Sequence, residues 1–232
     1  MMHRVPDTLI GIGLYTPAEA GKLVQISPAK INRWLRGHHV KSQQYDPLWT
    51  PQVDLGEQGI ILGFRDLMEI RVASAFIEQG LSAQKVRQAI QLARELIKDE
   101  RPLSTSRFQT DGRSVFLQVV EGDGQTKFID LFKSQYAFHE ILKRSLRNIE
   151  YDAEGVPARW WVFGKTRSIV VDPARSFGRP IEAETSVPAE VLAAAAEAEG
   201  SVEAAARAWD VPVRAIKRAV AFIDEMSLRN AA

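Results

Sequence analysis

The side chains best suited to chemistry lie on one short predicted helix near the start of the chain. Residues 28–36, PAKINRWLR, bring Lys30, Asn32, Arg33 and Arg36 together. Lysine and arginine bind phosphates or the edge of guanine, and asparagine can bind adenine through two hydrogen bonds. An α-helix also fits the major groove of B-DNA. These residues therefore predict a helix that reads duplex DNA.

The segment 15–37 that must position this helix is typical of a helix-turn-helix. Thr16-Pro17 and Ser27-Pro28 each supply a hydroxyl cap followed by proline at the first helical position, a pattern that begins a helix. Trp34 is expected in the core. The predicted DNA contacts, which include the helix end and a following wing, are Thr16, Lys30, Asn32, Arg33, Arg36, His38 and Lys41. An amphipathic helix pair with a solvated basic face stays open as the alternative.

Composition favours a binding protein of two or three modules over an enzyme. The 232 residues carry a formal net charge of +1, with a basic stretch at 1–45 and an acidic one at 182–210, which suggests different partners for the two ends. The four histidines lack metal-ligand spacing, and neither a nucleophile motif nor a phosphate-binding loop is found. We expect no catalytic residue, no metal site and no cofactor.

The absence of cysteine excludes disulfides and thiolate metal sites and suits a reducing cytoplasm. The opening residues MMHRVPDTLIGIG hold too short an apolar run for a secretion signal, and no run elsewhere is long enough to span a membrane. We therefore expect a cytoplasmic protein with no membrane partner.

The pattern along the chain predicts an α+β, predominantly helical fold. A loop or β-wing is expected at 38–62, and strands at 127–132, 160–165 and 168–171. Phe108 to Val119, with a turn at Asp111-Gly112, predicts a β-hairpin. Helices are predicted at 64–80, 83–100, 134–150, 188–199 and 212–226, with a further short helix capped by Ser201.

The front of the chain resembles the winged helix-turn-helix domain of MerR-type regulators. The resemblance rests on Tyr15, Thr16, Glu19, Ala20, Leu23, Ile26, Ser27, Ile31, Arg33 and Trp34, and continues through the helices after the wing. It implies a DNA-binding domain over residues 8–100. The long dimerising coiled coil and the effector pocket of that family are not visible in the sequence.

The last third of the chain resembles domain-of-unknown-function family 433. The matching residues are Pro173, Gly178, Pro180, Ile181, Thr185, Val187, Pro188, Val213, Ala219 and Phe222, while Glu184 and Ser186 depart from the family pattern. Members are commonly antitoxins of PIN-like ribonuclease toxins. Together the two resemblances imply a VapB-type antitoxin that binds operator DNA, represses its own transcription and neutralises a cognate toxin.

This combined resemblance implies three regions. They are a DNA-binding domain over residues 8–100, a β-hairpin and helix region for connection or dimerisation over residues 101–158, and a small helical antitoxin-type domain over residues 159–232. Arginine binds carboxylates as a fork, so a plug for the acidic nuclease site is expected beside the turn at residues 177–178. The residues expected to bind the toxin are Arg167, Arg175, Phe177 and Arg179.

Several alternatives remain open. Residues 201–222 could form a second helix-turn-helix with Arg214, Lys217 and Arg218 outward, although packing or dimerisation suits them better, and residues 105–150 could meet a second copy or the toxin. The expected state is a homodimer, because paired half-sites raise the affinity of short recognition helices. A stand-alone regulator without a toxin, and an adaptor that never touches DNA, are the competing functions.

Overall fold

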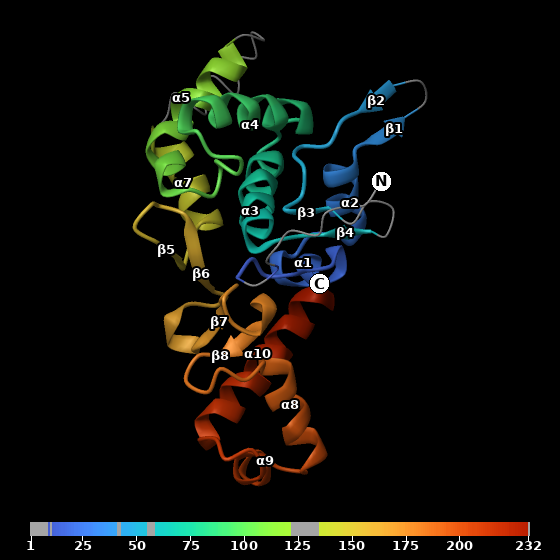
Figure 1. The fold of residues 1–232 in the computed structure, drawn as a ribbon, viewed down its shortest axis with the longest axis vertical. Helices are drawn as coiled ribbons and strands as arrows, with labels where there is room; N and C mark the ends of the chain where they lie inside the picture. The colour runs from blue at the N-terminus through green and yellow to red at the C-terminus, as the bar shows by residue number, and fades with distance from the viewer. Residues whose placement is uncertain (1–8, 10, 41–42, 55–58, 122–134, 232) are drawn as a thin grey trace.

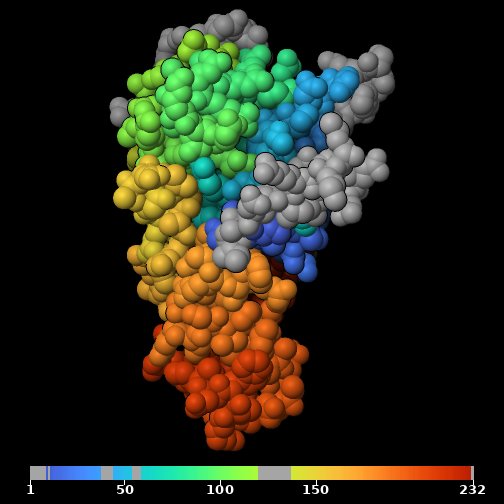
Figure 2. Space-filling model, viewed as in Figure 1, coloured from blue at the N-terminus to red at the C-terminus, as the bar shows by residue number. Residues whose placement is uncertain are grey.

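The computed structural model describes residues 9, 11–40, 43–54, 59–121 and 135–231. It confirms the predicted class, an α+β fold dominated by helices. The winged unit and helices α3, α4, α5 and α7 occupy one end of the molecule, strands β5 to β8 lie in the middle, and α8 to α10 form the other end (Figure 1). The same view in space-filling form narrows toward the C-terminal helices (Figure 2).

The described helices other than α5 were expected from the sequence, although the helix expected at 134–150 ends at Ser145 and residues 149–150 belong to a strand. They are α1 Pro17–Val24, α2 Pro28–Arg36, α3 Phe64–Glu78, α4 Ala83–Ile97, α5 Ser106–Glu121, α7 Gln135–Ser145, α8 Ala189–Ala198, α9 Val202–Ala208 and α10 Val213–Ala231, with 3-10 turns η2 Lys165–Arg167 and η3 Ser176–Gly178. Hydroxyl caps at Ser82 and Ser201 begin α4 and α9, as their sequences predict.

The described strands form three antiparallel sheets. They are β1 His38–Val40 with β2 Gln43–Tyr45, β3 Val53–Asp54 with β4 Ile60–Ile61, and the four-stranded sheet of β5 Ile149–Tyr151, β6 Pro157–Trp161, β7 Ile169–Val171 and β8 Pro180–Glu182 in sequential order. The first pair is the predicted wing. The strand expected at 127–132 lies outside the described residues.

The β-hairpin expected from Phe108 to Val119 is wrong, because these residues belong to helix α5. Phe108, Val115 and Phe116 are fully buried and recur at helical spacing. Gly112 leaves room for the ring of Phe108, one turn earlier on the same helix. A Cβ at Gly112 would lie 2.7 Å from that ring. The hairpin of this middle region lies later, in β5 and β6.

The described residues form two hydrophobic cores. The larger one joins the helix-turn-helix to α3, α4, α5 and α7, with the Phe76 ring centroid 4.2 Å from that of Phe116 and 5.7 Å from that of Phe138. The smaller core packs α8, α9 and α10 against Ile169 of β7 and consists largely of alanine. The middle helices therefore share their core with the DNA-binding candidate rather than with the C-terminal helices.

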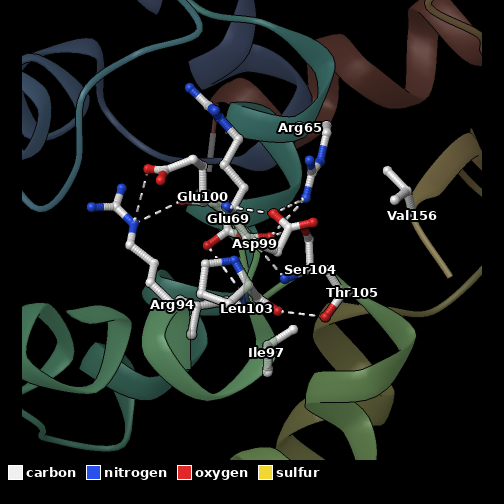
Figure 3. Close-up of polar contacts among 12 residues, drawn as sticks. Arg65, Glu69, Arg94, Ile97, Asp99, Glu100, Leu103, Ser104, Thr105 and Val156 are labelled. Atoms are coloured by element: carbon white, nitrogen blue, oxygen red, sulfur yellow. Dashed lines mark hydrogen bonds and ion pairs between the residues drawn. The ribbon is translucent and has the colours of Figure 1, made fainter. Parts of the chain in front are cut away.

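Buried carboxylates on α3 fix the loops on either side of it. Asp66 accepts hydrogen bonds from Trp49 Nε1 at 3.1 Å, Gly63 N at 2.9 Å and Arg101 Nε at 2.6 Å. One turn later, Glu69 accepts the backbone N–H groups of Leu103 and Ser104 at 3.2 and 2.7 Å (Figure 3). The loop after α4 is thus held to α3 through its backbone.

Tyr15 joins the two ends of the molecule. Its backbone pairs with Leu62 just before α3, and its hydroxyl donates to the Gly178 carbonyl oxygen at 2.7 Å. The neighbouring Leu14 N–H donates to the Phe177 carbonyl oxygen at 2.9 Å. Burial and the nearby Asp172 raise the pKa of Tyr15, so the hydroxyl stays a hydrogen-bond donor. We call residues 169–231, which hold β7, β8 and α8 to α10, the C-terminal unit. The bonds at Tyr15 and Leu14 join this unit to the helix-turn-helix.

The ionisation of a buried carboxyl group, Glu69, should make the free energy of unfolding depend on pH. Burial raises the pKa of Glu69 to about 7, against an ordinary carboxyl value of 4.5. The folded protein keeps this proton where the unfolded chain has lost it, so the Glu69 contribution is largest at low pH. It should fall by about 3 kcal/mol as pH rises from 4.5 to 7.

The test is urea unfolding of Glu69→Gln and of wild type between about pH 5 and 8. The glutamine side chain cannot ionise, so the variant should lose this fall in the free energy of unfolding. Glu95→Gln, at an exposed position on α4, should keep it. A fall that persists in Glu69→Gln would assign it to other groups.

The close contact between Gly178 and Tyr15 predicts that a larger residue at position 178 lowers the free energy of unfolding. Gly178 and Gly200 have left-handed backbones, with φ of +80° and +75°, but a Cβ at Gly178 would overlap the Tyr15 hydroxyl while one at Gly200 meets open space. Gly200→Ala should lower the free energy of unfolding by about 1 kcal/mol and Gly178→Ala by roughly 2–4 kcal/mol. Equal losses in thermal or urea unfolding would contradict the close approach.

Candidate nucleic-acid interface

The first two helices form a compact pair with their caps in place. Thr16 Oγ1 accepts the Glu19 N–H while the Glu19 carboxylate accepts the Thr16 N–H at 2.8 Å, which is a reciprocal capping box. Ser27 caps α2 by accepting the Lys30 N–H at 3.3 Å. Buried Ala20, Ile26 and Ile31 supply the small shared core.

The turn between the helices depends on one glycine and one left-handed residue. Gln25 adopts φ 61° and ends α1, and its backbone N–H donates to the Gly21 carbonyl oxygen. A Cβ at Gly21 would lie 2.5 Å from the Ile26 carbonyl oxygen, closer than two such atoms approach. Glycine at this point allows α2 to cross directly over α1.

The outward face of α2 carries two free arginines. Ala29, Arg33 and Arg36 are exposed and follow one another at helical spacing, while Ile31, Trp34 and Leu35 are buried beneath them. Within the part of the chain that the structure describes, neither Arg33 nor Arg36 has a carboxylate partner. Their guanidinium groups are therefore available to phosphates or base edges.

The other predicted DNA-contacting residues are more constrained. Lys30 Nζ lies 5.0 Å from the centroid of the Trp34 ring, so the buried Trp34 supports a cation at the edge of this face. Asn32 Nδ2 donates back to the Pro28 carbonyl oxygen at 2.9 Å, which occupies one donor of the amide. Thr16 is exposed but serves as a helix cap.

The wing begins directly after α2. Gly37, at φ +70°, ends the helix where the Tyr45 carbonyl oxygen of β2 approaches too closely for any Cβ. His38 lies in β1, and Lys41 lies outside the described residues. Arg87 of α4 holds the base of the wing by donating from Nε to the Pro47 carbonyl oxygen at 2.9 Å.

A groove of about 470 Å³ runs beside Lys30 and Arg33, and its far wall is the start of α4. Tyr45 of β2 and residues 82–84 line this groove, and sequence reasoning did not assign them to the site. The N-terminus of a helix favours anions through its free N–H groups. The Ser82 cap was recognisable in the sequence, but its position beside α2 follows from the packing of α4 on α3.

Of the predicted toxin-binding residues, Arg175, Phe177 and Arg179 lie in or beside the turn η3. The expectation that Arg167 also flanks this turn is wrong, because Arg167 lies in η2, at the other end of the β7–β8 strand pair. Arg175 Nε is paired with Asp172 at 3.0 Å, and Arg179 Nη1 is paired with Glu190 at 3.0 Å. Arg167 is exposed, without a carboxylate partner among the described residues. Phe177 is 61% exposed although its backbone is left-handed, at φ 53°. The structure therefore gives these four residues unequal freedom to meet a partner.

The cations of the possible second helix-turn-helix are largely engaged within the chain. Arg214 pairs with Glu184, and Arg218 Nη1 lies 2.9 Å from the buried Glu182. Hydrogen bonding to Arg214 lowers the pKa of Glu184. Lys217 is exposed on α10. These ion pairs fasten α10 to the turn after β8.

No group of three or more histidine or acidic side chains suited to a metal occurs among the described residues. No helix in the described parts of the chain combines the length and apolar character needed to cross a membrane.

Comparison with known proteins identifies a structure of similar fold but no family. No family model matches the chain, and no curated protein matches it. The chain is similar to a crystal structure of Rv2018 from Mycobacterium tuberculosis, with a TM-score of 0.65 and 20% identity over 91% of this chain and 98% of that one. At this identity the similarity concerns the arrangement of the elements alone.

Proposed function

We propose that the protein binds duplex DNA through α2 and regulates transcription. The observation that carries the proposal is the outward face of α2, where Arg33 and Arg36 are exposed and unpaired among the described residues. By contrast, Arg175 and Arg179 near the C-terminal helices are paired with carboxylates. The start of α4, which lines the groove beside Lys30 and Arg33, supplies further backbone N–H groups for phosphates.

The proposed contacts divide into two kinds. Arg33, near the middle of α2, reads a base edge or a phosphate in the major groove, and Arg36, at its last turn, holds a flanking phosphate. One nine-residue helix reads only a few base pairs. Two copies bound to half-sites about 34 Å apart would provide operator affinity, so we propose a homodimer on DNA.

Binding to the DNA upstream of its own gene tests this proposal. Arg33→Ala should weaken binding by about 1–3 kcal/mol, and Arg36→Ala should reduce the slope of log affinity against log salt by about 1. Arg207→Ala removes an exposed arginine on α9 at the opposite end and should leave both quantities unchanged. Fluorescence anisotropy across a salt series measures them. Equal binding by wild type and the Arg33→Ala/Arg36→Ala double variant would reject α2 as the DNA-binding surface.

We further propose that the C-terminal unit binds a protein partner, the PIN-like ribonuclease toxin that the resemblance implies. Phe177 supports this part of the proposal. Three consecutive residues, Ser176 to Gly178, have left-handed backbones, and they present the Phe177 ring to solvent. Such strain persists where the surrounding structure holds it, and it concentrates at binding sites. Among the predicted toxin-binding cations, Arg167, in η2, is the one without a carboxylate partner in the described chain.

Co-expression with the product of the neighbouring gene tests the partner. Phe177→Ala should reduce recovery of the toxin by tenfold or more, the order of effect typical of a central aromatic residue at an interface. Leu96→Ala removes an apolar side chain that is 56% exposed on α4 and should have no effect. Operator binding should be equal in both variants. Undiminished toxin recovery with Phe177→Ala would place the partner elsewhere, and absence of any toxin would favour a stand-alone regulator.

A further inference from the structure

A cleft of about 360 Å³ lies where the helix-turn-helix, α3, the four-stranded sheet and α10 meet. In Figure 1 the end of α10 reaches α1, and β6 descends beside α3 toward the same region. The turn after α1 contacts α10 directly, since Gln25 Nε2 lies 3.4 Å from Asn230 Oδ1. The cleft is walled by segments that are far apart in the sequence, from Leu23 at the end of α1 to Arg229 near the end of α10.

Five arginines and one carboxylate give the cleft its charge. Arg71 comes from α3, Arg144 and Arg147 from the end of α7 and the residues after it, Arg167 from η2 and Arg229 from α10. The carboxylate, Glu225, accepts a hydrogen bond from Arg229 at 2.8 Å. The other four arginines have no ion pair with any described residue. The cleft thus holds a large excess of positive charge.

Arg71 is the arginine that most lacks an anion. Its guanidinium lies 4.2 Å from the centroid of the Trp160 ring, and its Nη1 lies 3.7 Å from the Met68 sulfur. Burial lowers the pKa of Arg71 to about 10, and the Tyr151 side chain offsets this only in part. Among the described residues, no carboxylate pairs with Arg71. An anion that entered the cleft would supply the missing partner.

Aromatic rings hold two of these cations in place. Trp160 supports Arg71, and Phe163 lies under Arg229 at 4.4 Å. A guanidinium stacked on a ring keeps its fork of N–H donors fixed, and this lowers the entropy cost of binding an oxyanion. Leu23 and Val162 add apolar wall beside the charged groups, which suits the organic part of a ligand.

We propose that this arginine cleft binds a small phosphorylated molecule. Arginines converging from separate elements match the several oxygens and double charge of a phosphoryl group, and a single carboxylate would satisfy fewer of them. The cleft volume is at the lower end of small-ligand pockets, which is enough for a nucleoside or sugar monophosphate. The cleft borders α1 and not the outer face of α2, so the proposal stands whether or not α2 binds DNA.

Isothermal titration of the full chain with adenosine 5′-monophosphate, ribose 5-phosphate and pyrophosphate tests the proposal. At least one of these probes should bind, while adenosine, which has no phosphate, should not. Arg144→Ala/Arg147→Ala should weaken binding by about tenfold or more, because each arginine supplies charge-assisted hydrogen bonds. Arg71→Met, which keeps an apolar chain against Trp160, should do the same.

Lys143→Ala is the matched control, because Lys143 is exposed beside Arg144 on α7 but does not line the cleft. It should bind the probe as wild type does. Thermal unfolding of each variant without ligand separates loss of binding from loss of folding. The proposal is overturned if none of the three probes binds at millimolar concentration, or if the arginine variants bind equally well. It is also overturned if only an oligonucleotide binds through these residues.

Discussion

The hydrogen bond from the Tyr15 hydroxyl to the Gly178 carbonyl oxygen, 2.7 Å long, sets the relation between the two ends of the molecule. Tyr15 immediately precedes the cap of α1, and its backbone also pairs with Leu62 before α3. Three chain segments therefore meet at one buried residue. A hydroxyl withdrawn from water must find an acceptor. The Gly178 carbonyl is that acceptor, and the missing side chain of glycine allows the close approach. At the same junction α10 packs against α1, and both helices border the arginine cleft.

The positions of the carboxylates determine which arginines of this protein are neutralised within the chain. The net charge of +1 gives no sign of a basic surface. In the C-terminal unit, Asp172, Glu182 and Glu190 neutralise nearby arginines and fasten helices to turns. Arg33 and Arg36 on α2, and the four unpaired arginines of the cleft, have no such neighbours among the described residues. We interpret the two unpaired groups as separate anion-binding surfaces, one for nucleic acid and one for a small ligand.

The predictions that held were local. The caps at Thr16, Ser27 and Ser82 fixed the starts of α1, α2 and α4, because a hydroxyl that satisfies a free N–H acts within three residues. The same reasoning failed at Asp111-Gly112, where a turn signal was given more weight than the helical spacing of Phe108, Val115 and Phe116. Burial of those rings against Phe76 decided the outcome, and it requires knowledge of which helices are neighbours.

The sequence by itself determined the helix-turn-helix, its exposed arginines, the wing and the helices of the last third, since each depends on caps, periodicity or glycine over a short span. The tertiary structure alone decided which cations are neutralised and which are free. Nothing in the sequence distinguishes Arg175 and Arg179 from Arg167, yet in space they pair with Asp172 and Glu190. The arginine cleft was invisible for the same reason: its residues lie between positions 23 and 229, and Coulomb interactions depend on distance through space rather than along the sequence.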